Sequence, residues 1–146
     1  MLKDIRHIGI VVKNIEESML FYRGLLGFEV YDQRNETGGF IDGILQLRNT
    51  EVTTYKMKRS GFIGHIELLY FRFPRSKERD RKINDIGIGH IAFTVKDLEL
   101  EYDRLSNEGI FFLSKPQLSA DGKAKVAFCR APEGTFIELV QVIEGY

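Results

Sequence analysis

The chain has 146 residues, of which 43% are hydrophobic and 29% charged, so its composition is that of a folded globular protein. Its 21 basic and 21 acidic residues cancel, which argues against the basic surface of a general nucleic-acid-binding protein. No apolar run approaches the roughly 20 residues that span a bilayer, and charged residues interrupt the N-terminal stretch, unlike a signal peptide. The single cysteine, Cys129, cannot form an internal disulfide. We therefore expect a cytoplasmic protein with no nucleic-acid or membrane partner.

The first half of the chain predicts a strand, a helix, a strand, a short helical segment and two more strands. "IRHIGIVV" is apolar on both faces, as in a buried strand, and Asn14 is a suitable N-cap for the next helix. Apolar positions three and four residues apart continue to Leu26, and Gly27 can end the helix in a left-handed conformation. The remaining segments are, in order, "FEVYDQ", the helical "GGFIDGILQL", "EVTTYKMK" and "GHIELLYFRF".

The second half predicts the same order of elements. "GHIAFTV" is a strand, Asp97 caps a helix that runs to about Asn107, and further strands are expected at "IFFL", "KAKVAFCR" and "GTFIELVQV". Between the halves, "RFPRSKERDRKIND" is charged and contains Pro74, as a linker does. We therefore expect a single domain over residues 1–146 with one module at about 1–73, a linker at about 74–86 and a second module at about 87–146.

The two halves are related in sequence. "IRHIGIVVKN" and "IGHIAFTVKD" align with His7 and His90 in register, 83 positions apart. "IELL" and "IELV" align with Glu67 and Glu138 in register, 71 positions apart, so the first half holds 12 more residues between its histidine and its glutamate. The "GGFIDGILQL" segment accounts for roughly that difference. The repeat predicts an α+β fold of two tandem βαβββ modules.

The repeated histidines and glutamates suit a metal site. A single histidine on an apolar strand is more often a packed residue than a ligand, but a glutamate between apolar residues needs a partner. Two imidazoles and two carboxylates can bind one divalent cation and leave roughly two positions open. Such an ion polarises a substrate carbonyl, and a glutamate ligand that loosens its bond can act as a base. The matched positions favour a metal site at His7, Glu67, His90 and Glu138.

Both ends of the chain resemble the vicinal oxygen chelate superfamily, which includes glyoxalase I, methylmalonyl-CoA epimerase, bleomycin-binding proteins and extradiol dioxygenases. "RHIGIVVKNIEESMLFYRGLLGFEV" is similar to the family's opening strand and helix. "APEGTFIELVQ" is similar to its "DPDGN…EL" ending, although Ala131, Glu133 and Thr135 depart from that pattern. The resemblance covers nearly the whole chain and implies paired modules whose curled mixed sheet forms a cup around a metal. It also implies a homodimer.

By this resemblance, His7, Glu67, His90 and Glu138 fall on the family's ligand positions, and the set is that of glyoxalase I. The implied function is a lyase or isomerase that uses Ni, Zn, Co or Mn and acts on a small molecule, with Glu138 or Glu67 moving the proton. One alternative is an acyl-CoA epimerase, although those enzymes usually have Gln where Glu67 stands; the basic linker could then bind coenzyme A phosphates. The other is a non-catalytic small-molecule-binding protein of the bleomycin-resistance type.

A few other residues are candidates for substrate contacts. His65 shares the strand face of Glu67 and either contacts substrate or fills space beside the site. Lys123, in "LSADGKAKV", either reaches an anionic group or belongs to a plain exposed turn. Tyr55 and Lys56 alternate, so only one can face the site, and the pattern does not choose between them. "GGFIDGILQL" either lines a pocket or supports a dimer interface. Cys129 is expected to be a packed strand thiol rather than a nucleophile.

Overall fold

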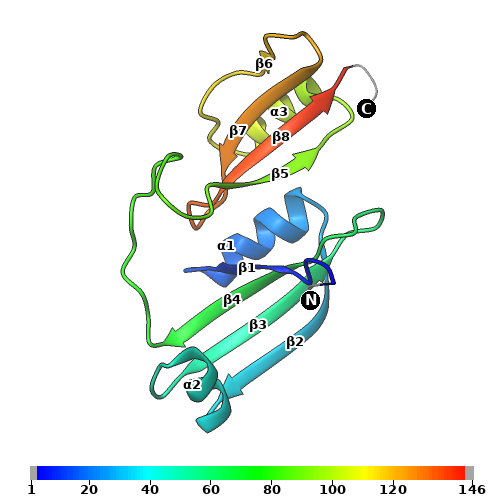
Figure 1. Cartoon of the computed structure of the whole chain (residues 1–146). Coiled ribbons are helices and arrows are strands. Elements are labelled where there is room, and N and C mark those ends of the chain that lie inside the picture. The colour runs from blue at the N-terminus through cyan, green and yellow to red at the C-terminus, as the bar shows by residue number, and fades with distance from the viewer. Residues whose placement is uncertain (1–2, 144–146) are drawn as a thin grey trace. The chain divides into compact units, whose positions relative to one another are not determined.

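The computed structural model describes residues 3–143 and divides the chain into two compact units, Met1–Glu78 (unit 1) and Arg79–Tyr146 (unit 2) (Figure 1). Each unit contains a four-stranded mixed sheet and follows the βαβββ order, with one additional helix in unit 1. The α+β fold with two related modules, predicted from the repeat, is therefore confirmed.

Unit 1 has the sheet order β1-β4-β3-β2, in which β1 runs parallel to β4 and the other pairs are antiparallel. The second predicted strand is longer than expected, because β2 continues past "FEVYDQ" to Thr37. The elements of unit 1 are β1 (Ile8–Val11), α1 (Ile15–Met19), the π-helical η1 (Leu20–Leu25), β2 (Glu29–Thr37), α2 (Gly39–Leu45), β3 (Glu51–Lys58) and β4 (Ile66–Phe73).

Local sequence accounts for the limits of the first helix. The Asn14 side chain accepts a hydrogen bond from the Glu17 amide and caps α1. Gly27, with φ +72°, turns the chain in the left-handed conformation that glycine adopts without strain, and β2 starts shortly afterwards. The apolar core of the unit is made by side chains from the helix and from one face of the sheet: Ile10, Val12, Phe21, Tyr22, Leu26, Phe28, Met57, Ile66 and Leu68.

Unit 2 repeats this arrangement with the order β5-β8-β7-β6, and β5 is parallel to β8. The Asp97 side chain accepts a hydrogen bond from the Leu100 amide and caps α3, which packs against β7 and β8. The elements are β5 (His90–Thr94), α3 (Leu98–Asn107), β6 (Gln117–Leu118), β7 (Ala124–Arg130) and β8 (Phe136–Val142). Its buried apolar residues are Ile91, Leu98, Leu105, Ala127, Cys129, Ala131, Phe136, Ile137 and Leu139.

The strand expected at "IFFL" is the main error in the predicted elements. There the structure has an isolated bridge between Phe112 and Cys129, and β6 lies farther along at Gln117–Leu118. Pro116, between the two, has no amide hydrogen to donate, which interrupts the ladder of hydrogen bonds.

The extra segment of unit 1 forms a helix, as predicted, and buries one side. Ile41 of α2 is buried, whereas Phe40 and Ile44 are exposed. The Asp42 side chain accepts hydrogen bonds from the amides of Asn49 and Thr50 and so ties the helix to the start of β3.

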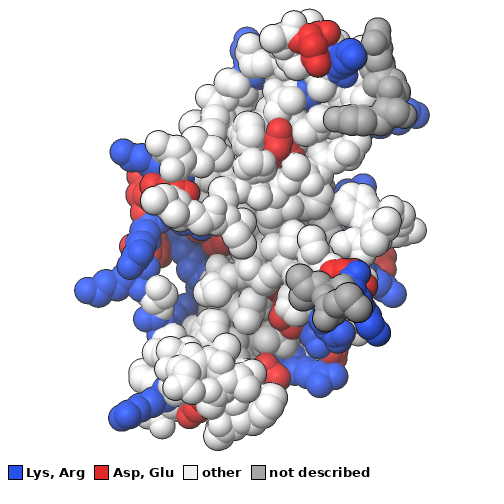
Figure 2. Space-filling model, viewed as in Figure 1, with Lys and Arg blue, Asp and Glu red and all other residues white. Residues whose placement is uncertain are grey.

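No helix within residues 3–143 is both long and apolar enough to cross a membrane. Acidic and basic side chains are interspersed on the face of the protein drawn in Figure 2, in keeping with their equal numbers.

Candidate functional site

Each unit contains one histidine–glutamate pair, formed by the residues that the repeat singles out. Nε2 of His7 lies 3.1 Å from Oε2 of Glu67, and Nε2 of His90 lies 3.0 Å from Oε2 of Glu138. The glutamate side chains are 11% and 19% exposed, whereas the histidines are 33% and 42% exposed. Both pairs therefore combine a largely buried carboxylate with an imidazole that solvent can reach.

The same strand register builds both pairs. In unit 1, Gly9 lies opposite Glu67 on the parallel strands β1 and β4, and His7 stands two residues before Gly9. In unit 2, Ala92 lies opposite Glu138 on β5 and β8, and His90 stands two residues before Ala92. Because side chains two residues apart on a strand share a face, each histidine meets the glutamate of the neighbouring strand. We call this side of each sheet the pair face.

The geometry of each pair fits two ligands of one metal ion. Two ligand atoms about 2.1 Å from an ion and at right angles to each other lie about 3 Å apart, close to the separations observed here. Imidazole nitrogen and carboxylate oxygen are donors that several first-row divalent metals accept. Within residues 3–143, no three or more His, Cys, Asp or Glu side chains gather into a group that could hold a metal. Each unit by itself brings together two of the four predicted ligands.

Charged residues continue across the pair face of unit 1. Lys56 lies opposite Glu67 on β3, and Asp32 lies opposite Lys56 on β2, so the three side chains form a row across the sheet. Tyr55 lies opposite Leu68, on the core face. The structure thus selects Lys56 rather than Tyr55 as the residue beside the pair.

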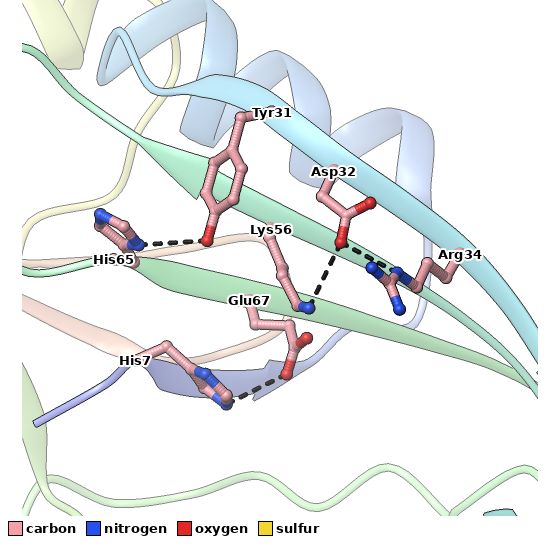
Figure 3. A network of polar contacts seen from close by, with 7 residues as sticks. All are labelled: His7, Tyr31, Asp32, Arg34, Lys56, His65 and Glu67. Atoms are coloured by element: carbon pink, nitrogen blue, oxygen red, sulfur yellow. Dashed lines mark hydrogen bonds and ion pairs between the residues drawn. The ribbon is translucent and has the colours of Figure 1, made fainter.

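Asp32 holds two cations in this row. Its Oδ2 atom lies 3.3 Å from Nζ of Lys56 and 3.0 Å from Nε of Arg34 (Figure 3). Desolvation acts to raise the pKa of Asp32, but the hydrogen bonds and positive charges of Lys56 and Arg34 together outweigh it and lower the pKa below its usual value. The carboxylate is therefore ionised at neutral pH and orients both cations.

His65 lies close to the pair and is engaged by a tyrosine. Its Nδ1 atom is hydrogen-bonded to the Tyr31 hydroxyl at 3.1 Å, with the two rings edge to face (Figure 3). Nζ of Lys58 lies 5.7 Å from the centre of the Tyr31 ring. The predicted position of His65, on the strand that carries Glu67, is thus a polar one with Tyr31 as its partner.

Aromatic side chains and one arginine lie beside the pair in unit 2. Phe128 of β7 lies opposite Glu138, in the place that Lys56 occupies in unit 1, and packs edge-on against the His90 ring at 5.3 Å between ring centres. Phe136, next to Arg130, is buried. Arg130 lies opposite Phe136 on the same side of the sheet, with its guanidinium 4.8 Å from the centre of the Phe136 ring. The pair face of unit 2 therefore has an aromatic ring where unit 1 has Lys56, and an arginine beyond it.

The structure does not bring Lys123 beside this pair. It lies in an exposed turn where its amide donates to the Asp121 side chain. The next residue, Ala124, pairs with Val142, four positions along β8 from Glu138. That separation is about 13 Å along the strand.

Cys129 is a packed strand thiol, as predicted. It lies opposite Ile137, is fully buried, and belongs to the core face rather than the pair face. Burial raises the pKa of the thiol to about 12, so the thiolate is scarce at neutral pH and the group is a poor nucleophile.

Two arginines near the linker already have backbone partners within their own units. Arg75 donates to the carbonyl of Lys13, and Arg81 donates to the carbonyl of Ile88, both at 2.9 Å.

Tyr31, Asp32 and Arg34 were not identified from the sequence. A β-bulge between Val30 and Asp32 leaves Tyr31 without a register partner and moves Asp32 onto the pair face. The only available signal was the pair of opposite charges in "YDQR", which is common in exposed strands.

The chain is similar to known proteins over most of its length. Residues 4–139 match the Glyoxalase/Bleomycin resistance protein/Dioxygenase superfamily. A lactoylglutathione lyase of Schizosaccharomyces pombe is 33% identical over 147 aligned residues, which cover 96% of this chain and 48% of that protein; the chain thus spans about half the length of this relative. The uncharacterized protein YwkD of Bacillus subtilis is 32% identical over 75% of each chain. A crystal structure of a glyoxalase family protein from Bacillus cereus has the same fold, with a TM-score of 0.86, 21% identity and coverage of 99% of this chain and 97% of that one.

Proposed function

The chain belongs to the Glyoxalase/Bleomycin resistance protein/Dioxygenase superfamily, and on that basis we propose that it is a metal-dependent lyase or isomerase of the glyoxalase I type. The observation that carries the proposal is the recurrence of one histidine–glutamate pair, with the same atoms at 3.1 and 3.0 Å, in both units. The similarity to a lactoylglutathione lyase supports a thiol adduct of a small α-ketoaldehyde as substrate.

In this proposal, His7, Glu67, His90 and Glu138 are the ligands of one divalent ion, Ni, Zn, Co or Mn. The ion supplies Lewis acidity, which polarises a substrate carbonyl or its neighbouring hydroxyl. The carboxylates offset the two positive charges of the ion, which favours binding at these largely buried positions. Imidazole and carboxylate groups bind a metal ion in their deprotonated forms, so metal affinity should fall at acidic pH.

One of the two glutamates moves the proton. It takes a proton from the carbon that bears sulfur and returns it to the adjacent carbon, while the hydroxyl proton passes to the neighbouring carbonyl oxygen. The two transfers convert a thiohemiacetal into an isomeric thioester without any other reactant. We assign this role to Glu138, because its side chain is more exposed than that of Glu67 and Phe128, which lies opposite it, offers an apolar ring to the substrate.

Two features argue against the alternatives. Arg75 and Arg81 of the basic linker each donate a hydrogen bond to a backbone carbonyl, so both side chains are positioned without a phosphate ligand. A protein that only sequesters a small molecule has no need for both histidine–glutamate pairs. We also expect a homodimer, which sedimentation analysis would detect.

The experiment that tests the proposal is metal analysis of the purified protein together with single variants of its three histidines. We expect about one equivalent of metal per chain in the wild type, a loss in His7→Ala and His90→Ala, and retention in His65→Ala, the matched control. The wild type should also convert the methylglyoxal–glutathione adduct to a thioester. Absence of metal after reconstitution with all four ions would overturn the proposal.

A further inference from the structure

We infer that Lys56 is a positioning residue that holds the Glu67 carboxylate in place as a metal ligand. The inference rests on the proposed function, since it takes Glu67 as one of the four ligands. It gives a physical reason why Glu138, rather than Glu67, is the glutamate that loosens its bond and moves the proton.

The sheet places Lys56 between two carboxylates. On β3 it lies opposite Glu67 of β4 on one side and opposite Asp32 of β2 on the other. Directly opposed side chains have Cβ atoms about 5 Å apart, so the three side chains lie next to one another on the pair face. Figure 3 shows the ammonium group of Lys56 between the carboxylates of Asp32 and Glu67.

Lys56 has donors to spare for Glu67. An ammonium group carries three N–H donors, and Asp32, 3.3 Å from Nζ, anchors the group while using one of them. Within residues 3–143, His7 is the one ion-pair partner of Glu67, and the contact uses only Oε2. The other oxygen, Oε1, is therefore left for Lys56. Carboxylates that bind a metal are commonly hydrogen-bonded in this way, which fixes their orientation.

The row of charges makes this donor compatible with a nearby cation. Arg34, Asp32, Lys56 and Glu67 alternate in sign across the sheet, and Asp32 offsets the charge of Lys56. Lys56 therefore adds a hydrogen-bond donor beside Glu67 without a local excess of positive charge to repel a divalent ion.

Glu138 lacks an equivalent donor from the neighbouring strand. Phe128 occupies the place of Lys56 in unit 2, and a phenyl ring has no hydrogen to donate. Within residues 3–143, the ion-pair partner of Glu138 is His90 alone. The Glu138 carboxylate is thus held by fewer groups than that of Glu67.

Arg130 does not supply the missing donor. Its guanidinium donates to the side chain of Asp80 at 3.1 Å and to the backbone carbonyl of Arg81, and it lies over the Phe136 ring. These contacts direct the cation of unit 2 toward the linker rather than toward Glu138.

The test is the affinity for zinc, measured by competition with a chelating dye, which needs no turnover. We expect Lys56→Met to bind zinc about 10–100-fold more weakly than the wild type, the usual cost of removing a group that orients a ligand. Lys56→Arg keeps a charged donor and should retain most of the affinity. Circular dichroism should be unchanged in both variants. Unchanged or tighter zinc binding by Lys56→Met would overturn the inference, since a lysine that only repelled the ion would have that effect.

Lys125→Met is the matched control. Lys125 also lies on a strand and is also paired with an acidic residue, Glu99 of α3, at 2.9 Å. Because it lies opposite Gln141 rather than Glu138, on the side of the sheet that carries α3, its replacement should leave zinc affinity unchanged.

A second experiment transfers the lysine to the other unit. Phe128→Lys places a donor opposite Glu138, whereas Phe128→Met removes the ring without adding one. At equal zinc content, we expect kcat of Phe128→Lys to be at least about tenfold below that of Phe128→Met, because the glutamate that moves the proton is then held. Equal kcat in the two variants would contradict a holding role for the lysine.

The zinc measurement separates the inference from the proposed function. Weaker zinc binding by Lys56→Met, together with no turnover of any adduct by the wild type, would support the inference and overturn the proposed lyase activity. Turnover of the adduct by the wild type, together with unchanged zinc affinity in Lys56→Met, would do the reverse.

Discussion

Units 1 and 2 share a sheet order and a histidine–glutamate pair, yet they surround that pair with different chemistry. In unit 1 the residue opposite the glutamate is Lys56, tied to Asp32, and in unit 2 it is Phe128, packed on the histidine. Both pairs depend on the same register between the first and last strands. The pair is common to both copies, whereas its surroundings have diverged.

The largest expected effect is on kcat, when one of the two glutamates is replaced by glutamine. Glu138→Gln should lower kcat by about 10²–10⁴, the range expected for loss of a general base, while the protein stays folded. Glu67→Gln, the matched change in unit 1, should mainly weaken metal binding and lose less kcat once metal is saturating. Steady-state kinetics at several metal concentrations would distinguish the two effects. If Glu67→Gln has the larger effect on kcat at saturating metal, the roles of the two carboxylates are reversed.

Much of this symmetry could be predicted from the sequence because the repeat conserves residue types at fixed spacing. His7 and His90, and likewise Asn14 and Asp97, are each 83 positions apart, and each pair has the same structural role in the two units. A strand histidine and a helix cap can both be recognised from a short stretch of sequence. Two stretches that match therefore predict the same structural positions in the two units.

The asymmetry could not be predicted in this way, because it depends on strand register. The choice between Tyr55 and Lys56 follows from pairing with β4, and the position of Asp32 follows from the bulge after Val30. A shift of one residue exchanges the two faces of a strand, and periodicity alone does not show where a bulge occurs. The displaced β6 has a similar cause, since alternation suggested pairing at Phe112 but Pro116 interrupts it.

An effect of intermediate size is expected on stability at alkaline pH, because the core of unit 2 contains a buried thiol and the core of unit 1 does not. Cys129 lies opposite Ile137, and the corresponding partner of Ile66 in unit 1 is Met57, which does not titrate. Burial raises the pKa of Cys129 from 9.0 to about 12, so the unfolded chain loses this proton first as the pH rises. The free energy of unfolding should therefore fall between pH 9.0 and about 12, by about 1.4 kcal/mol per pH unit from this group.

Urea unfolding at a series of alkaline pH values, compared with Cys129→Ala, would measure this contribution. The alanine variant loses some packing at every pH, but the pH-dependent difference between the two proteins belongs to the thiol. Hydrogen exchange should show that the alkaline loss begins in unit 2. Parallel pH profiles for the wild type and Cys129→Ala would contradict a raised pKa.

The smallest expected effect is the change in the free energy of unfolding when one of the two helix-capping residues is replaced. Asn14 and Asp97 each accept a hydrogen bond at 3.1 Å from the amide three residues on, so Asn14→Ala and Asp97→Ala should each lower the free energy of unfolding by about 1 kcal/mol. Asp97 also places a negative charge at the positive end of α3, which adds a few tenths of a kcal/mol that salt should reduce. Urea unfolding at low and high salt would therefore show salt sensitivity for Asp97→Ala and little for Asn14→Ala. Equal salt dependence would mean that the two caps act through their hydrogen bonds alone.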